Sequence, residues 1–206
     1  MEISRHTHML EINGHNVCLY PVLTWDDDHI ILIDAGFPGQ TDVFVRAIED
    51  AGQRVEALTD IILTHQDADH IGCVHDLLKL APNARVIAHT EEAPYIDGTL
   101  PPIKGFHSQN IRVDQTVTDG EILPMCGGIE VVHTPGHTPG HICLLLHEGN
   151  VIVCGDALNI SNGKIIGPNP QYTQDMATGL LSLEKIKSFH PAAVVSYHCD
   201  YLKCDG

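Results

Sequence analysis

The chain has 206 residues, of which 43% are hydrophobic, and its formal net charge at pH 7 is −16. Such an acidic chain repels phosphate backbones, so we expect no nucleic-acid partner. Its hydrophobic stretches all fall short of the roughly 20 residues that a membrane-spanning helix needs, so we expect no membrane partner either.

The first half of the chain mixes strands with helices. Apolar runs predict strands at 9–12 and 17–23, joined by the hairpin-type turn signal Asn13-Gly14. Apolar residues at helical spacing predict a helix over 40–51, which Gly52 ends. Further strands are expected at 30–33, 60–64 and 86–88, and a short helix at 73–80.

The second half is expected to hold more strands and one long helix. Strands are predicted at 129–132, 142–146, 151–154 and 193–195, and a helix at 177–189. Residues 90–110, with one helical turn after Thr90, and 157–174 are rich in loop-forming residues. Clustered strands with interspersed helices favour two packed sheets with helices outside over a doubly wound parallel sheet.

The cysteines indicate a reducing environment. There are seven, without a CxxC pair, and an odd number cannot close entirely into intramolecular disulfides. The N-terminus lacks the basic and apolar regions of a secretory signal, so we expect a cytoplasmic protein. We also expect one domain over residues 1–206, because no linker divides the chain.

The segment His65-Gln-Asp67-Ala-Asp69-His70 follows an apolar run and concentrates metal-binding side chains. Neighbouring carboxylates repel each other and imidazoles must be oriented, so such a cluster is unfavourable unless it binds a cation. Other residues of the same chemical types also lie where an apolar strand gives way to a loop. These are Asp34, His137, Asp156 and His198.

Five motifs contain these residues, in chain order from residue 32 to residue 198. They are Leu32-Ile-Asp34-Ala-Gly36, Thr64-His65-x-Asp67-x-Asp69-His70-x-Gly72, Thr134-Pro-Gly-His137-Thr-Pro-Gly-His141, Cys154-Gly-Asp156-Ala-Leu158 and Ser196-Tyr-His198. The set resembles the motifs of the metallo-β-lactamase fold superfamily. The resemblance implies an α+β fold, an αββα four-layer sandwich of two mixed β-sheets with outer helices, and a metal site at one edge of the sheets.

The resemblance also implies a dinuclear centre that binds two divalent metal ions per chain. The ions are expected on His65, Asp67 and His137, and on Asp69, His70 and His198, with Asp156 bridging both. Asp34 is expected to orient a ligand from outside, because metal ligands are commonly held by further hydrogen bonds.

Asp67 stands where most members of the superfamily carry histidine. Ligation rich in carboxylates shifts the preference from zinc toward manganese or iron, although affinity order and availability can still favour zinc. Two alternatives stay open for Asp67. It can cap a helix or bond within its loop, and it can be too short to reach the metal, which leaves a single-metal site.

A dinuclear centre of this kind predicts a metal-dependent hydrolase. Two cations can share a hydroxide that attacks at neutral pH, and one of them stabilises the developing oxyanion. We expect Asp69 to carry the proton from this water to the leaving group. Two other classes remain open: a redox-active di-iron protein that reduces or senses oxygen, and a metal-binding module without catalysis.

The expected substrate is a small ester, thioester, lactone or phosphoester. The secreted zinc β-lactamases usually carry cysteine where Asp156 stands, which disfavours antibiotic hydrolysis. Thioester hydrolysis of the glyoxalase II type fits Asp156, although those enzymes carry a C-terminal helical region that binds glutathione, and this chain stops eight residues after His198.

Several further residues are assigned by default to structure. His133 and His141 flank His137 and are expected to be structural, whereas His107 lies in a loop from which it can contact substrate. Some aromatic residues can line a pocket, but packing is the better interpretation for any one of them. They are Phe37, Tyr95, Phe106 and Tyr172.

Overall fold

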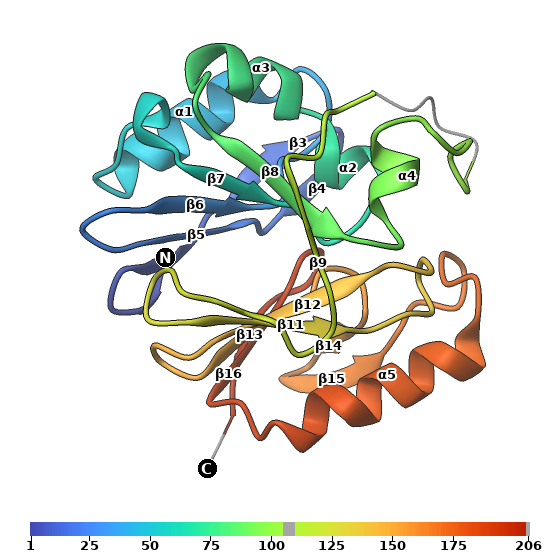
Figure 1. The fold of residues 1–206 in the computed structure, drawn as a ribbon. Coiled ribbons are helices and arrows are strands. Elements are labelled where there is room, and N and C mark those ends of the chain that lie inside the picture. Colours follow the sequence, from blue (N-terminus) through green and yellow to red (C-terminus); the bar gives the residue numbers. More distant parts are fainter. Residues whose placement is uncertain (105–109, 205–206) are drawn as a thin grey trace.

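The computed structural model of the protein describes residues 1–104 and 110–204. Two mixed β-sheets pack face to face between outer helices (Figure 1). Helices α1 (Thr41–Asp50) and α3 (Val74–Leu80) cover one sheet, and α5 (Met176–Ser188) covers the other. The predicted αββα sandwich is therefore confirmed.

The first sheet is antiparallel on one side and parallel on the other. Its strands are β1 (Glu2–Ser4), β2 (Thr7–Met9), β5 (Val22–Trp25), β6 (Ile30–Ile33), β7 (Asp60–Ile62), β8 (Arg85–His89) and β9 (Gln115–Val117). Within the described residues they lie in the order β1-β2-β5-β6-β7-β8-β9. Strands β6 to β9 run parallel, which brings their carboxyl ends to one edge of the sheet.

The second sheet is mostly antiparallel. Its strands are β10 (Ile122–Leu123), β11 (Ile129–His133), β12 (Ile142–Leu146), β13 (Val151–Val153), β16 (Ala193–Ser196) and β17 (Asp200–Lys203). They follow one another across the sheet in chain order. Strand β13 pairs in parallel with β16 and shares its direction with β11, because both β11 and β13 are antiparallel to β12.

Two hairpins and three short helices complete the described elements. The hairpins are β3 (Ile12–Gly14) with β4 (Val17–Leu19), and β14 (Asn159–Ser161) with β15 (Lys164–Gly167). The short helices are the 3₁₀-helix η1 (Val55–Ala57), α2 (Ala68–Ile71) and α4 (Ala93–Ile96). In the described part of the chain, every helix is too short or too polar to cross a membrane.

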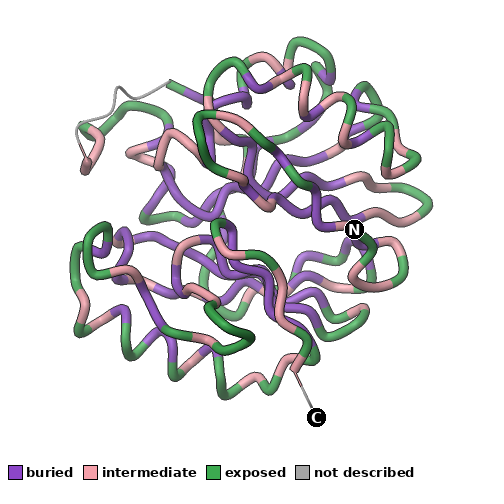
Figure 2. The backbone as a smooth tube through the Cα atoms, turned by 180° about the vertical axis from the view of Figure 1, so that it is seen from behind, coloured by how far each residue is buried: buried purple, intermediate pink, exposed green. Residues whose placement is uncertain are grey.

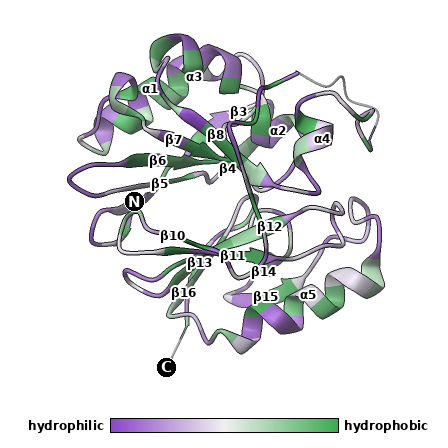
Figure 3. Cartoon of the chain, viewed as in Figure 1, coloured by the Kyte–Doolittle hydropathy of each residue, from purple (hydrophilic) through white to green (hydrophobic). Residues whose placement is uncertain are grey.

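Strand periodicity divides the core into layers. Along β6, Ile31 and Ile33 face the second sheet, whereas Leu32 faces the outer helices, because successive side chains of a strand point to opposite faces. A third layer, which includes Leu183 and Ile186 of α5, lies behind the second sheet. The central strands are consequently buried along their length (Figure 2) and strongly hydrophobic (Figure 3).

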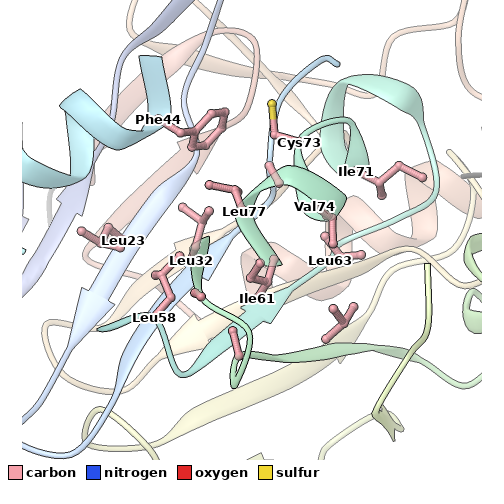
Figure 4. Close-up of a cluster of buried hydrophobic side chains, with 14 of the residues drawn as sticks. Leu23, Leu32, Phe44, Leu58, Ile61, Leu63, Ile71, Cys73, Val74 and Leu77 are labelled. Atoms are coloured by element: carbon pink, nitrogen blue, oxygen red, sulfur yellow. The ribbon is translucent and has the colours of Figure 1, made fainter. Parts of the chain in front are cut away.

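Helix α1 packs on the first sheet through one face. Phe44 and Ile48 are spaced four residues apart, so both project from the same side of the helix, and both are fully buried. Phe44 belongs to the cluster that contains Leu32, Ile61 and Leu77 (Figure 4). This packing fixes the strands whose carboxyl ends lead into the predicted ligand loops.

The structure differs from the predicted elements near the N-terminus. The first hairpin turns at His15-Asn16, with φ of 51° and 63°, rather than at Asn13-Gly14. The predicted strand 17–23 is divided between β4 and β5. Tyr20 donates its N–H to the carbonyl of Tyr197 at 2.9 Å, and Pro21 has no N–H to offer to a strand ladder.

The predicted loop 157–174 contains the β14–β15 hairpin. It turns at Asn162-Gly163, with φ of 51° and 68°, the left-handed conformations that a two-residue hairpin turn of this type requires. The Asn-Gly signal is present in the sequence, but the glycine, proline and asparagine content of the segment favours a loop. The helical turn expected after Thr90 is α4.

Replacing Phe44 by alanine is expected to destabilise the fold by about 3–5 kcal/mol, because the change removes a fully buried ring and leaves a cavity. The measurement is urea unfolding followed by circular dichroism. The matched control is Leu181→Ala on α5, whose side chain is 72% exposed and whose loss is expected to stay within about 0.5 kcal/mol. Similar losses in both variants would contradict this core assignment.

Candidate metal centre

The predicted ligands meet because strand ends from both sheets converge. Asp34 follows β6, and the segment from His65 to His70 begins shortly after β7. In the second sheet, strands β11, β13 and β16 share one direction, and a loop follows each of them. These loops carry His137, Asp156 and His198.

A first group of ligand atoms forms around Asp67. Its Oδ2 lies 3.5 Å from His65 Nε2 and 3.1 Å from His137 Nε2. His137 Nε2 also lies 3.4 Å from Asp156 Oδ2. The structure therefore brings together the four residues predicted for one half of the centre.

A second group forms around Asp69. Its Oδ2 lies 3.2 Å from His198 Nε2 and 3.8 Å from His70 Nε2. Asp156 Oδ1 approaches the same two imidazoles, at 3.2 Å from His198 and 3.3 Å from His70. Asp156 thus turns one oxygen toward each group, which is the geometry expected of a bridging carboxylate.

The chemistry of these atoms fits divalent cations. His65 Nε2, His70 Nε2 and Asp156 Oδ1 are buried, and among the described residues none of them has a hydrogen-bond partner. Burying such groups without a partner costs free energy, and a cation shared among them would remove that cost. Imidazole and carboxylate are also the ligands that zinc, manganese and iron accept.

Asp34 orients the second group from behind. Its buried carboxylate accepts hydrogen bonds from the Thr64 N–H at 2.9 Å, from the Thr64 hydroxyl at 2.8 Å and from His70 Nδ1 at 2.8 Å. An ionised carboxylate only accepts, so His70 carries its proton on Nδ1 and turns Nε2 toward the ligand group. Asp34 itself has a φ of 64°, a strained conformation for a residue with a side chain.

Asp67 does not cap the helix that follows it. It occupies the position before α2, but its side chain accepts no cap hydrogen bond. The carboxylate instead faces His65 and His137. The alternative of a helix-capping side chain is therefore wrong.

Lys104 is part of the site and was not predicted. Its Nζ donates to Asp67 Oδ2 at 2.5 Å and lies 2.7 Å from His137 Nε2. The backbone N–H of the neighbouring Ile103 donates to Gln66 Oε1 at 3.0 Å. In the sequence, Lys104 is a single lysine in a loop rich in proline and glycine, and no spacing connects it to the ligand motifs.

Glu92 joins the two ligand loops and was also missed. Its buried carboxylate accepts hydrogen bonds from the Gln66 N–H at 2.9 Å and side-chain amide at 3.1 Å. From the other loop it accepts the Thr138 hydroxyl at 3.0 Å and the Gly140 N–H at 2.9 Å. Burial raises the pKa of Glu92, although these donors favour its charged form. The loops that carry Asp67 and His137 are thereby tied together.

Tyr197 ties the second ligand group to the loop after β6. Its buried hydroxyl donates to the Asp69 carbonyl at 2.7 Å and accepts the Gly36 N–H at 3.1 Å. Its ring lies over the His70 imidazole, with 3.9 Å between the ring centroids. Gly72 lets its segment lie close to the loop after β6, because an added Cβ would clash with Pro38 N.

The structure gives the two flanking histidines positions outside both ligand groups. His141 Nε2 accepts the Asp156 N–H at 3.1 Å, and burial holds the pKa of His141 well below its usual value, which keeps the ring neutral for this role. His133 Nε2 donates to the Pro139 carbonyl at 2.8 Å, and its ring stacks on His89. Both rings thus make contacts outside the two ligand groups.

A cavity of about 490 Å³ opens over the ligand groups. Phe37 and Tyr172 line it, so two of the proposed aromatic positions do face the site. Tyr95 lies in α4, and Phe106 and His107 lie outside the described residues. The rest of the lining consists of Val17, Asp67, Asp69, Lys104, His137, Asp156, Asn159, Asn169, His198 and Cys199.

The ligand groups differ in protonation. Burial, helped by the charge of His70, lowers the pKa of His65 to about 4, so this imidazole is neutral at pH 7. Burial also opposes a charge on His198, but the nearby carboxylates of Asp156 and Asp69 outweigh it and raise its pKa to about 9. The pKa of buried His70 is raised as well, chiefly by the carboxylate of Asp34.

The chain belongs to the metallo-β-lactamase superfamily. Residues 20–198 match the sequence model of that family. The fold and the convergence of the motif residues agree with this membership, and the chain is accordingly a metallo-hydrolase.

Curated relatives include several hydrolases. The chain is 30% identical to the probable metallo-hydrolase YflN of Bacillus subtilis, over 96% of this chain and 85% of that protein. It is 32% identical to a hydroxyacylglutathione hydrolase of Francisella tularensis subsp. novicida, over 68% of this chain and 47% of that enzyme. An atrochrysone carboxyl ACP thioesterase of Emericella nidulans is 26% identical, over 92% of this chain and 53% of that enzyme.

Solved structures share the fold. A metallo-β-lactamase family protein from Thermus thermophilus superposes with a TM-score of 0.79 at 20% identity, covering 98% of this chain and 76% of that one. A metallo-β-lactamase from Cronobacter sakazakii gives a TM-score of 0.76 at 22% identity, covering 95% of this chain and 79% of that one.

Replacing Asp34 by asparagine is expected to weaken metal binding by about 10- to 100-fold, because the His70 ring loses the carboxylate that orients it. The measurement is competition with a chelator of known affinity. The matched control is Asp27→Asn, which removes one negative charge from an exposed position. An affinity equal to that of the control would refute the orienting role.

Metal binding is expected to release protons at pH 7. With its pKa raised to about 9, His198 is protonated in the metal-free protein at pH 7, and ligation requires a free ring nitrogen, so the affinity should rise with pH toward about 9. Calorimetry in buffers of different ionisation enthalpy counts the protons. His198→Gln should reduce the number of protons released, whereas His147→Gln, at a histidine outside both ligand groups, should not. Binding without proton release would contradict the raised pKa of His198.

Proposed function

We propose that the chain is a dinuclear metallo-hydrolase that cleaves small acyl thioesters. The observation that carries the proposal is the position of Asp156, whose two carboxylate oxygens each face a different ligand group. A carboxylate placed in this way serves two cations at once. Among the predicted ester-type substrates, relatives named hydroxyacylglutathione hydrolase and ACP thioesterase favour a thioester.

The proposed ligands are those of the two groups. One cation would bind His65, Asp67 and His137, the other would bind Asp69, His70 and His198, and Asp156 would bind both. The ion-pair distances around Asp67 and Asp69 support this division. Three carboxylates among seven ligands favour manganese or iron over zinc.

The residues around the cations have separate tasks. When bound, a pair of divalent cations lowers the pKa of water and polarises the acyl oxygen of the substrate. The charge of His70 and the hydrogen bond from His198 outweigh the effect of burial and lower the pKa of Asp69, so its carboxylate is ionised. Asp69 would accept the proton of the attacking water and deliver it to the leaving thiolate.

The cavity suits an acyl group of modest size. Val17, Phe37 and Tyr172 provide apolar wall beside the ligand groups, and Asn159 and Asn169 provide hydrogen-bonding groups. The chain spans about half the length of the hydroxyacylglutathione hydrolase and the ACP thioesterase, 47% and 53%. The glutathione and ACP parts of those substrates are therefore not assigned to the substrate of this protein.

We also infer that the protein is cytoplasmic. Cys73, Cys126, Cys143 and Cys154 are buried free thiols. Burial raises the pKa of Cys73, Cys126 and Cys154, which keeps these thiols protonated and unreactive. Such cysteines suit a reducing compartment.

Metal analysis followed by a substrate panel tests the proposed function. The protein is produced without added metal, its content is measured, and its manganese, iron and zinc forms are assayed on matched acyl thioesters, carboxylic esters, lactones and phosphoesters. Two metals per chain and fastest turnover of thioesters are expected. Oxygen consumption by the iron form without hydrolysis would establish the redox alternative. If no substrate is turned over and no oxygen is consumed, the protein is a metal-binding module without catalysis.

The Asp67→Ala variant tests whether two metals bind per chain. It removes one ligand of the first group, so metal content is expected to fall from two per chain toward one. A wild-type content of one metal that Asp67→Ala leaves unchanged would refute the dinuclear assignment.

Asp69→Asn is expected to reduce turnover by about 10²- to 10⁴-fold, the usual contribution of a general acid–base. Asparagine keeps an oxygen for the metal but cannot carry the proton, so metal content should fall much less than turnover. Steady-state kinetics on a thioester and metal analysis of the same sample provide both numbers. If the two fall together, Asp69 acts as a ligand alone; Asp27→Asn should change neither.

A further inference from the structure

We propose that Lys104 competes with a metal ion for the Asp67–His137 half of the centre, so that the Asp69–His70–His198 half fills first. The inference rests on the proposed dinuclear site and concerns the order in which its halves bind metal. Lys104 would thereby make the complete centre depend on the supply of metal.

The competition follows from the atoms that Lys104 contacts. Its Nζ donates to Asp67 Oδ2 at 2.5 Å and lies 2.7 Å from His137 Nε2. An ammonium group has donors only, so His137 Nε2 offers it the same lone pair that a metal would use. A cation bound to both atoms at ordinary ligand distances of about 2.0–2.2 Å leaves no room for the ammonium.

The backbone next to Lys104 is anchored at the site. The Ile103 N–H donates to Gln66 Oε1 at 3.0 Å, and Gln66 Nε2 donates to Glu92 at 3.1 Å. Because Gln66 immediately precedes Asp67, the loop of Lys104 is attached to the segment that carries its carboxylate partner. The Lys104 side chain is only 19% exposed, which makes this contact more than a solvent-screened surface pair.

Asp67 provides the charge that holds the ammonium. Asp67 gives Lys104 a charge-assisted hydrogen bond, which a histidine at this position would not provide. The aspartate that distinguishes this chain from the usual motif therefore has two possible partners, Lys104 and a metal ion.

Among the described ion pairs, the other half of the centre has no lysine or arginine partner. The contacts of Asp69 there are to the histidines His70 and His198. His70 is already oriented by its hydrogen bond to Asp34. A metal ion therefore enters this half in exchange for a proton rather than for a lysine side chain, and on that ground this half fills first.

Lys104→Met tests the proposal, because methionine keeps most of the side-chain length and removes the charge. Wild-type, metal-free protein titrated with Mn²⁺ in a calorimeter should show one tight and one weak step. In Lys104→Met the weak step should tighten by roughly 10- to 100-fold, the value of a lost charged hydrogen bond, while the tight step stays within about threefold. The electron paramagnetic resonance spectrum should then show coupled Mn²⁺ pairs at a lower metal concentration in Lys104→Met than in the wild type.

Two further variants control the test. Lys79→Met removes one positive charge from the 75%-exposed Lys79 and should leave both steps unchanged. Lys104→Gln retains a polar side chain without charge, and it replaces Lys104→Met should the latter fail a thermal unfolding control.

The outcomes separate this inference from the proposed function. If each of the two steps has the same affinity in Lys104→Met as in the wild type, the competition is overturned and the dinuclear centre stays in place. A single metal per chain in wild type and in both Lys104 variants overturns the dinuclear centre together with the competition. Tightening of the tight step instead of the weak one overturns the proposed order of filling.

Discussion

The candidate centre depends on one buried carboxylate, that of Asp34. It accepts hydrogen bonds from Thr64 and His70, and these bonds connect the end of β6 to the segment that follows β7. A buried charge is tolerated only where several donors surround it, so the loop after β7 must keep this conformation. The strained backbone of Asp34 is held by the same contacts. Tyr197 strengthens the arrangement by joining Gly36 to Asp69.

A second carboxylate, Glu92, links the halves of the molecule. Gln66 belongs to a loop of the first sheet, whereas Thr138 and Gly140 belong to a loop of the second, and all three donate to Glu92. The relative positions of Asp67 and His137 are therefore fixed by hydrogen bonds across the interface between the sheets, in addition to the apolar layer between them. The ligand groups are thus prepared by polar contacts that themselves bind no metal.

The sequence predicted what depends on local pattern and on motif order. The strands at 30–33 and 142–146 and the helix over 40–51 follow from apolar periodicity, and the motif residues from Asp34 to His198 do converge. Lys104 and Glu92 could not be found in this way, because their partners are 26 to 48 residues distant and no spacing rule connects them. The hairpin at 159–167 was missed for another reason: its strands have only three and four residues, and only its Asn-Gly turn marks it.

The proposed metal ligands and part of the cavity wall come from different parts of the fold. The ligands stand in segments that follow strands of the two large sheets, where packing and hydrogen bonds hold them. Val17 belongs to β4 and Asn159 to β14, which are strands of two small separate hairpins. Short surface hairpins tolerate changes in length and sequence more readily than the central strands. Substrate range can therefore diverge through the hairpins while the ligand geometry is inherited unchanged.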